Sequence, residues 1–216
     1  LRPRKFLGLG MNYKRHVEEL KDKGFKTSDY QVWFNKQVSC VNGPFSPIEK
    51  PRVSDALDYE GELAFVIGQR CRHVKAEDAS SVIAGYMIAN DVSVRDWQLH
   101  SATWTIGKSF DTHGPIGPAL VTPDEIEDPH NLDIRLYVND EIRQDSNTSD
   151  MIYSCFDMVE YLSTVFTLEP GDIFATGTPE GVGTGFNPPK FLRVGDTVRC
   201  EIEGLGAIEN EVIAEQ

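Results

Sequence analysis

Apolar and polar residues alternate along several short stretches of this 216-residue chain, and each such stretch predicts a β-strand. The clearest alternation runs from Leu132 to Val138 in steps of two residues. Asn139-Asp140 follows as a typical hairpin turn, and residues 141–143 form the returning strand. We predict further strands at residues 5–9, 85–90, 173–176, 197–203 and 207–213, the last two joined by Gly204-Leu205-Gly206.

The sequence predicts three helices, two of them from apolar residues at helical spacing. The strongest begins at Ser149 or Asp150 and has apolar residues at positions 152, 156, 159 and 162. A second begins at Asn12, runs to about Lys23 and ends at Gly24. A short third helix covers residues 76–84.

The segments without such patterns are expected to be irregular. Residues 24–56 contain three prolines and predict a long loop, and residues 92–118 predict an irregular pocket wall. Strands outnumber helices and do not alternate with them regularly, which argues against a doubly wound parallel sheet. We therefore predict an α+β fold with a mixed, mostly antiparallel sheet and few helices, in one domain that covers residues 1–216.

The composition narrows the possible functions. A net charge of −13 argues against binding to nucleic acid or to an anionic membrane surface, although a metal and a few cations can still attract a small anion into one pocket. No apolar run approaches the length of a membrane span, and no signal peptide is in view. We predict a cytoplasmic location. The chain starts at Leu1, so a missing upstream segment and an organellar location stay open.

The four cysteines, Cys40, Cys71, Cys155 and Cys200, are far apart and form no Cys-x-x-Cys motif. Their spacing excludes a zinc knuckle and a thioredoxin motif. Buried free thiols in a reducing compartment are the expected state.

Three acidic residues lie at the ends of apolar runs. Glu60 and Glu62 precede the strongly apolar residues 63–67, and residues i and i+2 of a strand share one face. Asp91 ends a second apolar run. Three converging carboxylates repel one another unless a divalent cation is bound, and their hard oxygens suit Mg²⁺, Ca²⁺ or Mn²⁺. A solvated edge with surface acids is the alternative at this point.

Other residues near these acids could serve a binding site. Lys108 lies between apolar neighbours, which indicates either a paired functional lysine or a lysine that reaches the surface. Arg95 and Gln98 follow Asp91 and could bind a carboxylate, or they could simply lie on the surface. His16 and Glu19 are neighbours on one helix and form either a general base with its orienting acid or a surface contact.

The segment Thr176 to Gly185 is rich in glycine and follows a predicted strand. Its glycine spacing matches neither the dinucleotide-binding pattern nor the P-loop, and Asn187-Pro188-Pro189 prevents the helix that such loops begin. The segment is either a tight wall that faces a ligand or a plain wide turn.

The motifs in their order resemble the fumarylacetoacetate hydrolase family over nearly the whole chain, in its short single-domain branch of acylpyruvate hydrolases, oxaloacetate decarboxylases and hydroxyheptadienedioate isomerases. The resemblance is carried by Asn12-Tyr13 with His16 and Glu19, Asp58-Tyr59-Glu60-Gly61-Glu62-Leu63, Asn90-Asp91-Val92-Ser93-Val94-Arg95-Asp96, Gly107-Lys108-Ser109-Phe110 and Gly171 to Gly183.

The resemblance implies a β-roll like the C-terminal domain of that family, a homodimer and a divalent metal, Mg²⁺ or Mn²⁺, without an organic cofactor. It implies that the metal ligands are Glu60, Glu62 and Asp91, that the catalytic residues are His16, Glu19 and Lys108, and that the substrate-binding residues are Lys36, Arg95, Gln98 and Thr178. His16 and Glu19 would activate water from a mobile lid helix at residues 12–24, and Lys108 would stabilise enolate charge. Relatives often have proline after the counterpart of Lys36, whereas this chain has Gln37.

The activity that the resemblance implies is a metal-dependent hydrolysis of a carbon–carbon bond in a small β-diketo acid, through an enolate. The expected partner is a small anionic keto acid, for example an acylpyruvate such as fumarylpyruvate or acetylpyruvate. Oxaloacetate decarboxylation and isomerisation of 2-hydroxyhepta-2,4-diene-1,7-dioate use the same residues and stay as alternatives. A non-catalytic fold stabilised by its metal is a further alternative.

Overall fold

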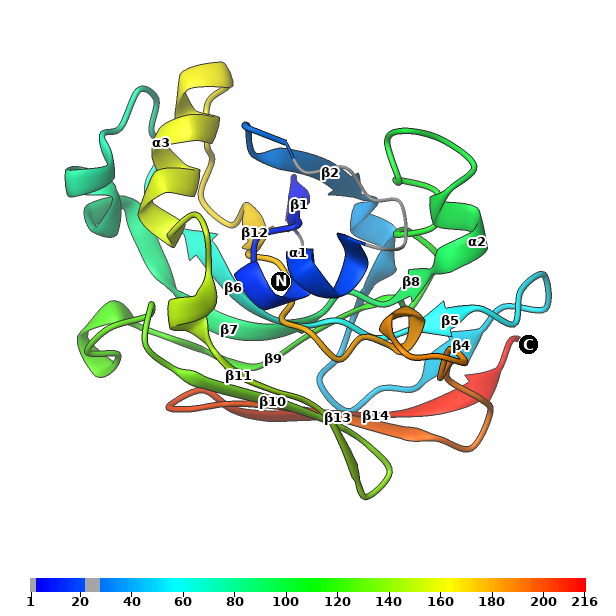
Figure 1. The fold of residues 1–216 in the computed structure, drawn as a ribbon. Coiled ribbons are helices and arrows are strands. Elements are labelled where there is room, and N and C mark those ends of the chain that lie inside the picture. Colours follow the sequence, from blue (N-terminus) through cyan, green and yellow to red (C-terminus); the bar gives the residue numbers. More distant parts are fainter. Residues whose placement is uncertain (1–2, 22–27) are drawn as a thin grey trace.

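Two packed β-sheets make up most of the protein in the computed structural model, which describes residues 3–21 and 28–216 (Figure 1). One sheet has seven strands in the order β2-β1-β12-β6-β7-β9-β3, and the other has five in the order β11-β10-β13-β14-β4. Strands β5 and β8 form a separate ribbon. Most neighbouring strands are antiparallel, while β1–β12, β3–β9 and β4–β14 are parallel. The predicted α+β fold with a mixed, mostly antiparallel sheet is confirmed.

The strands have the following bounds: β1 Phe6–Gly10, β2 Val32–Lys36, β3 Val41–Asn42, β4 Ile48–Lys50, β5 Leu57–Asp58, β6 Gly61–Ile67, β7 Ile83–Asn90, β8 Ser93–Val94, β9 Gly114–Val121, β10 Asp133–Val138, β11 Glu141–Asn147, β12 Ile173–Ala175, β13 Thr197–Ile202 and β14 Gly206–Ala214. The α-helices are α1 Lys14–Leu20, α2 Arg95–Gln98 and α3 Cys155–Val165. The 3-10 helices are η2 Val38–Cys40, η3 Ala76–Val82, η4 Pro123–Glu125, η5 Thr148–Asp150 and η6 Gly183–Gly185.

Strand β6 is buried on both faces, which explains its unbroken apolar sequence. Leu63, Phe65 and Ile67 belong to the main core, together with residues of β10, β13 and α3. The alternate residues Ala64 and Val66 belong to a smaller cluster on the other face of the seven-stranded sheet. The start of β6 is therefore held firmly in the interior of the protein.

The predicted hairpin at Asn139-Asp140 and the predicted terminal pair of strands are confirmed, since β10 pairs with β11 and β13 pairs with β14. The strongest predicted helix is also present, but it begins at Cys155 rather than at Ser149 or Asp150. The side chain of Ser154 accepts a hydrogen bond from the Asp157 amide, and the Asp157 side chain accepts one from the Ser154 amide. This capping box fixes the start of α3, and residues 148–150 form a separate 3-10 turn.

The prediction of irregular structure was wrong for parts of two segments. The predicted loop 24–56 contains β2, η2, β3 and β4, and the predicted irregular wall 92–118 contains β8, α2 and most of β9. Strands of two or three residues are too short to show a periodic pattern, and they form here because a neighbouring strand supplies hydrogen-bond partners. The predicted helix 76–84 is a 3-10 helix that ends at Val82.

The helix predicted from Asn12 is present as α1, which begins at Lys14. Its predicted end at Lys23 and Gly24 lies outside the described residues. None of the described helices combines the length and the apolar character that crossing a membrane would require. Cys40, Cys155 and Cys200 are buried free thiols, as expected, and Cys71 is a half-buried free thiol.

Candidate active site and metal centre

The two strands that carry the acidic residues are tied together where the acids lie. Gly61 at the start of β6 pairs with Asn90 at the end of β7. The Asp91 amide donates to the Glu60 carbonyl at 2.9 Å, and the Glu60 amide donates to Asn90 Oδ1 at 3.0 Å. As a result, carboxylate oxygens of Glu60, Glu62 and Asp91 all lie within 4.8 Å of one another, and all three residues are buried. The structure therefore brings the three predicted metal ligands together and excludes a solvated surface edge.

Three buried cations surround this acidic triad. Lys108 Nζ lies 2.6 Å from both Glu60 Oε2 and Asp91 Oδ2. Lys36 Nζ lies 2.6 Å from Asp91 Oδ1. Arg95 Nη1 lies 2.7 Å from Glu60 Oε1.

The fourth buried acid of this network is Asp58, which accepts from Arg95 Nε at 2.7 Å. Among the described residues of this network, four carboxylates face three cations when every group is ionised, so one negative charge is in excess. A bound divalent cation would reverse the sign of this network, and a pocket with net positive charge attracts an anionic substrate.

Burial and neighbouring charges separate the pKa values of the two glutamates. Burial raises the pKa of Glu60, but the charges of Lys108 and Arg95 outweigh it and lower the pKa to about 2. Burial raises the pKa of Glu62 well above its ordinary value, and the charges of Asp91 and Glu60 raise it further. Glu62 is thus the carboxylate whose charge is least compensated, and a nearby cation would relieve it.

The donor set fits a hard divalent cation. Carboxylate oxygens are the ligands that Mg²⁺ and Mn²⁺ prefer, and the triad contains neither histidine nor cysteine, the ligands that zinc favours. Lys108 pairs with two of the same oxygens, so metal and ammonium compete for them in part. Glu60, Glu62 and Asp91 are the residues that would hold the metal.

A histidine faces the same pocket from α1. His16 Nδ1 lies 2.9 Å from Glu19 Oε2, and His16 is buried. The other oxygen of Glu19 accepts from the Gly181 amide at 2.9 Å. A carboxylate can only accept, so Nδ1 carries the proton and Nε2 stays available as a base. The predicted pair of His16 and Glu19 therefore forms a real hydrogen bond inside a pocket rather than a surface contact.

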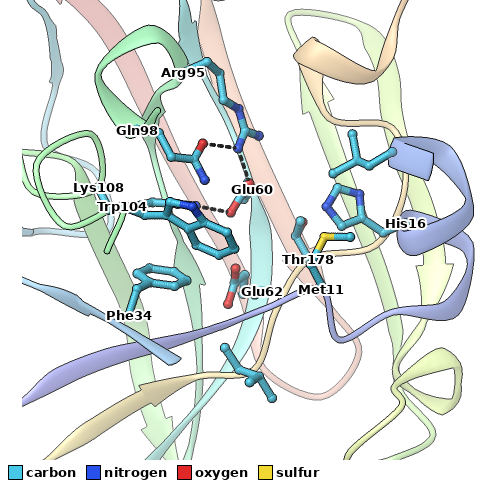
Figure 2. A pocket seen from close by; sticks show the side chains of 13 residues that line it. Met11, His16, Phe34, Glu60, Glu62, Arg95, Gln98, Trp104, Lys108 and Thr178 are labelled. Atoms are coloured by element: carbon cyan, nitrogen blue, oxygen red, sulfur yellow. Dashed lines mark hydrogen bonds and ion pairs between the residues drawn. The ribbon is translucent and has the colours of Figure 1, made fainter. Parts of the chain in front are cut away.

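One pocket is lined by most of the predicted site residues (Figure 2). Figure 2 shows Lys108 and two aromatic rings on one side of Glu60 and Glu62, and His16 on the opposite side. The lining residues are Leu9, Gly10, Met11, His16, Leu20, Phe34, Glu60, Glu62, Arg95, Gln98, Trp104, Lys108 and Thr178.

Lys36 lies next to the acidic triad but does not line the pocket. Its side chain is completely buried, and its ammonium donates to Asp91 Oδ1, to the Val92 carbonyl and to the Lys108 carbonyl. These three bonds use all of its donors. Lys36 binds a metal-ligand candidate and the backbone of Lys108 from behind, and a contact between Lys36 and the substrate carboxylate stays a prediction.

The glycine-rich segment is a tight wall of the site rather than a wide turn. The amides of Gly183 and Thr184 donate to Asp58 at 2.7 and 2.9 Å, and Thr178 lines the pocket. A Cβ atom at Gly185 would collide with the Glu19 carboxylate. The missing side chains of Gly183 and Gly185 allow the segment to lie directly against Asp58 and α1.

Three residues of the site were not predicted from the sequence as functional residues: Asp58, Phe34 and Trp104. A signal for Asp58 existed, because it lies two residues before Glu60 in an apolar context. Phe34 and Trp104 reach the pocket through long-range packing of β2 and of the segment before Lys108. No local pattern reports such packing.

Comparison with known proteins relates the whole chain to one group of enzymes. The family model described as fumarylacetoacetate (FAA) hydrolase C-terminal matches residues 5–213. The mitochondrial oxaloacetate tautomerase fahd2 of Xenopus laevis is 47% identical over 213 residues, which are 98% of this chain and 66% of that protein. The chain thus spans about two thirds of the length of the curated relatives that it matches.

Solved structures agree over the full chain. The crystal structure of 5-carboxymethyl-2-hydroxymuconate delta-isomerase from Mycobacterium smegmatis has a TM-score of 0.87 and 40% identity, and the match covers 100% of this chain and 81% of that chain. The 2-hydroxyhepta-2,4-diene-1,7-dioate isomerase from Mycobacterium marinum has a TM-score of 0.86 and 39% identity, with 100% of this chain and 76% of that chain covered.

Proposed function

This chain belongs to the fumarylacetoacetate hydrolase family, a family of enzymes, and from that premise we propose that it interconverts the keto and enol forms of a small 2-oxo dicarboxylic acid, with oxaloacetate as the first candidate. One observation carries the proposal. A histidine base, His16, faces an acidic triad and a buried ammonium across one small pocket. Such a pair of opposed groups can move a proton between carbon and oxygen.

A divalent cation held by Glu60, Glu62 and Asp91 would supply Lewis acidity that polarises the oxygens of a 2-oxo acid. The guanidinium of Arg95 reaches the same pocket, and its Nη2 atom has no hydrogen-bond partner among the described residues. A buried donor without a partner is costly, and a substrate carboxylate would satisfy it. Arg95 and Gln98 are therefore the residues that orient the acid end of the substrate.

Three side chains of the protein, those of His16, Glu19 and Lys108, would carry out the proton transfer. Nε2 of His16 removes a proton from the carbon next to the keto group, while Glu19 stabilises the resulting imidazolium. Lys108 donates to the oxygen on which negative charge develops, and this oxygen then takes a proton from the ammonium. His16 and Lys108 return to their starting states by exchanging protons with water, so the net change is the transfer of one proton from carbon to oxygen.

Helix α1 acts in this proposal as a lid that carries the base. Its described part, Lys14–Leu20, contains both His16 and Glu19, and its contacts with the glycine-rich segment place them over the acids. Movement of α1 away from that segment would admit substrate and withdraw the base at the same time.

Isomerisation of 2-hydroxyhepta-2,4-diene-1,7-dioate is the second candidate activity. It is supported by the likeness to the isomerase structure from Mycobacterium marinum, and it needs the same proton transfer without an attacking water. Hydrolysis of an acylpyruvate has weaker support, because several curated relatives are named as oxaloacetate tautomerases and the two structures compared above are named as isomerases. Decarboxylation of oxaloacetate shares the same enolate chemistry and stays an alternative.

The location proposed for the protein also changes. Several curated relatives are named as mitochondrial proteins, which supports a mitochondrial rather than a cytoplasmic location. Imaging of the tagged full-length protein together with a mitochondrial marker tests this, and a diffuse cytoplasmic signal would contradict it.

The function is tested with purified protein and Mg²⁺ or Mn²⁺. The loss of enol oxaloacetate is followed by its ultraviolet absorbance, and acetylpyruvate, fumarylpyruvate and the dienedioate are assayed in parallel. We expect fast tautomerisation that His16→Ala largely removes, while the matched variant Glu18→Ala, on the exposed side of the same helix, keeps it.

Cleavage of an acylpyruvate without tautomerisation of oxaloacetate would overturn the proposal in favour of hydrolysis. Metal that raises the melting temperature without turnover of any of these compounds would favour a non-catalytic fold.

A further inference from the structure

Two aromatic rings close the pocket on the side of Lys108. Phe34 comes from β2 and Trp104 from the segment between α2 and Lys108. Their ring centroids are 5.8 Å apart and their planes are inclined by 55°. Figure 2 shows both rings on the side of the glutamates that lies opposite His16. We call this pair, Phe34 and Trp104, the aromatic wall.

Strand β1 is shaped to accept this wall. Gly8 lies opposite Phe34 in the β1–β2 register, and a Cβ atom on Gly8 would run into the Phe34 ring. A Cβ atom on Gly10 would lie 2.5 Å from Cζ3 of Trp104. Residues i and i+2 of a strand share a face, so the two glycines leave one bare surface on which both rings rest.

The backbone of Trp104 is also unusual. Its φ angle is 60°, in the left-handed region that bulky residues rarely adopt. Such a conformation persists only where the surrounding structure enforces it, and it often marks a functional site. Here it turns the indole away from the exposed loop and onto Gly10, beside the pocket.

The wall also lies beside the reacting groups. Lys108 Nζ is 4.8 Å from the centroid of the Phe34 ring, and the same ammonium lies 2.6 Å from Glu60 Oε2. A substrate whose oxygens are held at Lys108 and the acidic triad therefore meets the wall as soon as its carbon chain extends in that direction. The wall offers a flat apolar surface and no charged group for a distant second carboxylate.

Trp104 is the outer part of this wall. Its side chain is half-buried, and its segment is partly exposed at Ile106. The indole bridges this segment and β1, so its removal would open the pocket toward solvent. Phe34, in contrast, is buried and supports the indole from inside.

We propose that Trp104, seated on Gly10, limits the length of the substrate, so that the pocket takes four-carbon 2-oxo acids and rejects longer ones such as dienedioates and acylpyruvates. This inference rests on the proposed function for the class of substrate. The tight seat of the indole makes it a fixed boundary, because a ring that is held on both sides cannot turn aside for a longer chain.

Binding rather than turnover provides the decisive test. The affinity of straight-chain 2-oxo monocarboxylates, from pyruvate to 2-oxooctanoate, is measured by calorimetry with Mg²⁺ present. For the unmodified protein we expect affinity to fall beyond four carbons. In Trp104→Ala, we expect the ratio of eight-carbon to four-carbon affinity to rise about tenfold or more, which is the effect typical of one methylene group in a tight pocket.

Matched variants distinguish a loss of the aromatic wall from a general loss of folding. Ile106→Ala changes an exposed residue of the same segment outside the pocket. This variant should keep the chain-length profile of the unmodified protein, that is, the dependence of affinity on the number of carbons. Trp104→Phe should give an intermediate profile, and it also serves if Trp104→Ala does not fold. Melting temperatures with and without Mg²⁺ report whether each variant keeps its fold and its metal.

Identical chain-length profiles in the unmodified protein and in the folded Trp104 variants would overturn the inference. Failure of the proposed function looks different, because oxaloacetate would then not be turned over while the binding series still changes with Trp104. The two ideas can thus fail independently.

Discussion

The acidic triad and the histidine–glutamate pair face each other across one pocket, but they are built in different ways. The triad lies at the joined ends of β6 and β7, and Lys36, Lys108 and Arg95 hold its carboxylates through buried ion pairs. His16 and Glu19 lie on a helix of seven residues. That helix is held to the body of the protein mainly through side-chain contacts.

The difference indicates a division of work. Groups at the ends of paired strands keep their geometry when substrate is absent. This suits residues that must be in place to bind a cation before substrate arrives. Groups on a short helix can leave and return, which suits a base that must make way for substrate.

Loss of a ligand from the triad should have the largest effect. Glu62→Gln keeps the shape of the side chain but removes its negative charge. Burial and the neighbouring acids already disfavour this charge, since they raise the pKa of Glu62. We expect Mg²⁺ affinity to fall by roughly a hundredfold or more. Activity should fall by roughly four orders of magnitude, since a metal contributes several kcal/mol to such reactions.

Calorimetric titration with Mg²⁺ measures the loss of affinity. Glu203→Gln, which changes an exposed acid far from the pocket, is the matched control. Unchanged Mg²⁺ affinity in Glu62→Gln would contradict the assignment of the triad as the metal site.

Loss of the base should come next. His16→Ala should lower kcat by about a hundredfold to a thousandfold, within the range of general acid–base catalysis. Because His16 is not one of the three ligand candidates, Mg²⁺ affinity should change little. A parallel loss of metal binding and activity in this variant would show that the two regions are not independent.

The fit between α1 and the glycine-rich segment can be tested without touching the base. A Cβ atom in Gly185→Ala would displace the Glu19 carboxylate and so misorient His16. We expect kcat to fall by about tenfold to a hundredfold, as is typical when a catalytic group shifts by about 1 Å.

The control is Gly195→Ala, where no atom lies within 4 Å of the new Cβ. The positive φ of Gly195 makes that change costly for stability, but it should leave the rate unchanged. Steady-state kinetics and thermal melting of both variants give the comparison. Equal rates in the two variants would exclude the contact with Glu19 as a determinant of the base.

The smallest effect is expected at Arg15, whose side chain ties the exposed side of α1 to the rest of the protein; we call its contacts the clamp. Arg15 Nη1 lies 2.9 Å from Glu180 Oε1, and Arg15 Nη2 donates to Ser146 Oγ at 2.7 Å. Half-exposed ion pairs contribute little, so Arg15→Gln should lower kcat/KM only about twofold to fivefold. The effect should shrink at high salt.

Arg135→Gln removes a similarly exposed ion pair on β10, far from the pocket, and should have no effect on the rate. Kinetics at low and high salt test both variants. A loss in Arg15→Gln that does not depend on salt would mean that the clamp acts by packing rather than by charge.

Much of the site could be predicted because its signals are local. The spacing of Glu60 and Glu62 reports a shared strand face, and the spacing of His16 and Glu19 reports a shared helix face. Asp91 is marked by the apolar run that it ends. These predictions needed only the period of a strand or a helix, and the geometry of the structure agrees with each.

The rest depends on contacts between distant parts of the chain. Strand β2 forms because β1 lies beside it, and this pairing carries Lys36 behind Asp91 rather than into the pocket. Trp104 reaches the site through a left-handed backbone angle and a missing side chain on Gly10. No pattern within one segment reports such contacts, which is why the sequence did not indicate the ion pair of Lys36 with Asp91 or a role for Trp104.

The two oxygens of Glu19 serve different neighbours, one binding His16 and the other the Gly181 amide. If α1 lifts from the body, the bond to Gly181 breaks and the carboxylate is free to turn away from the imidazole. The same movement that opens the pocket would then also remove the hydrogen bond that orients His16. An enol that meets the open form would then find no correctly oriented base. Proton transfer would be confined to ligands that the closed protein has already enclosed.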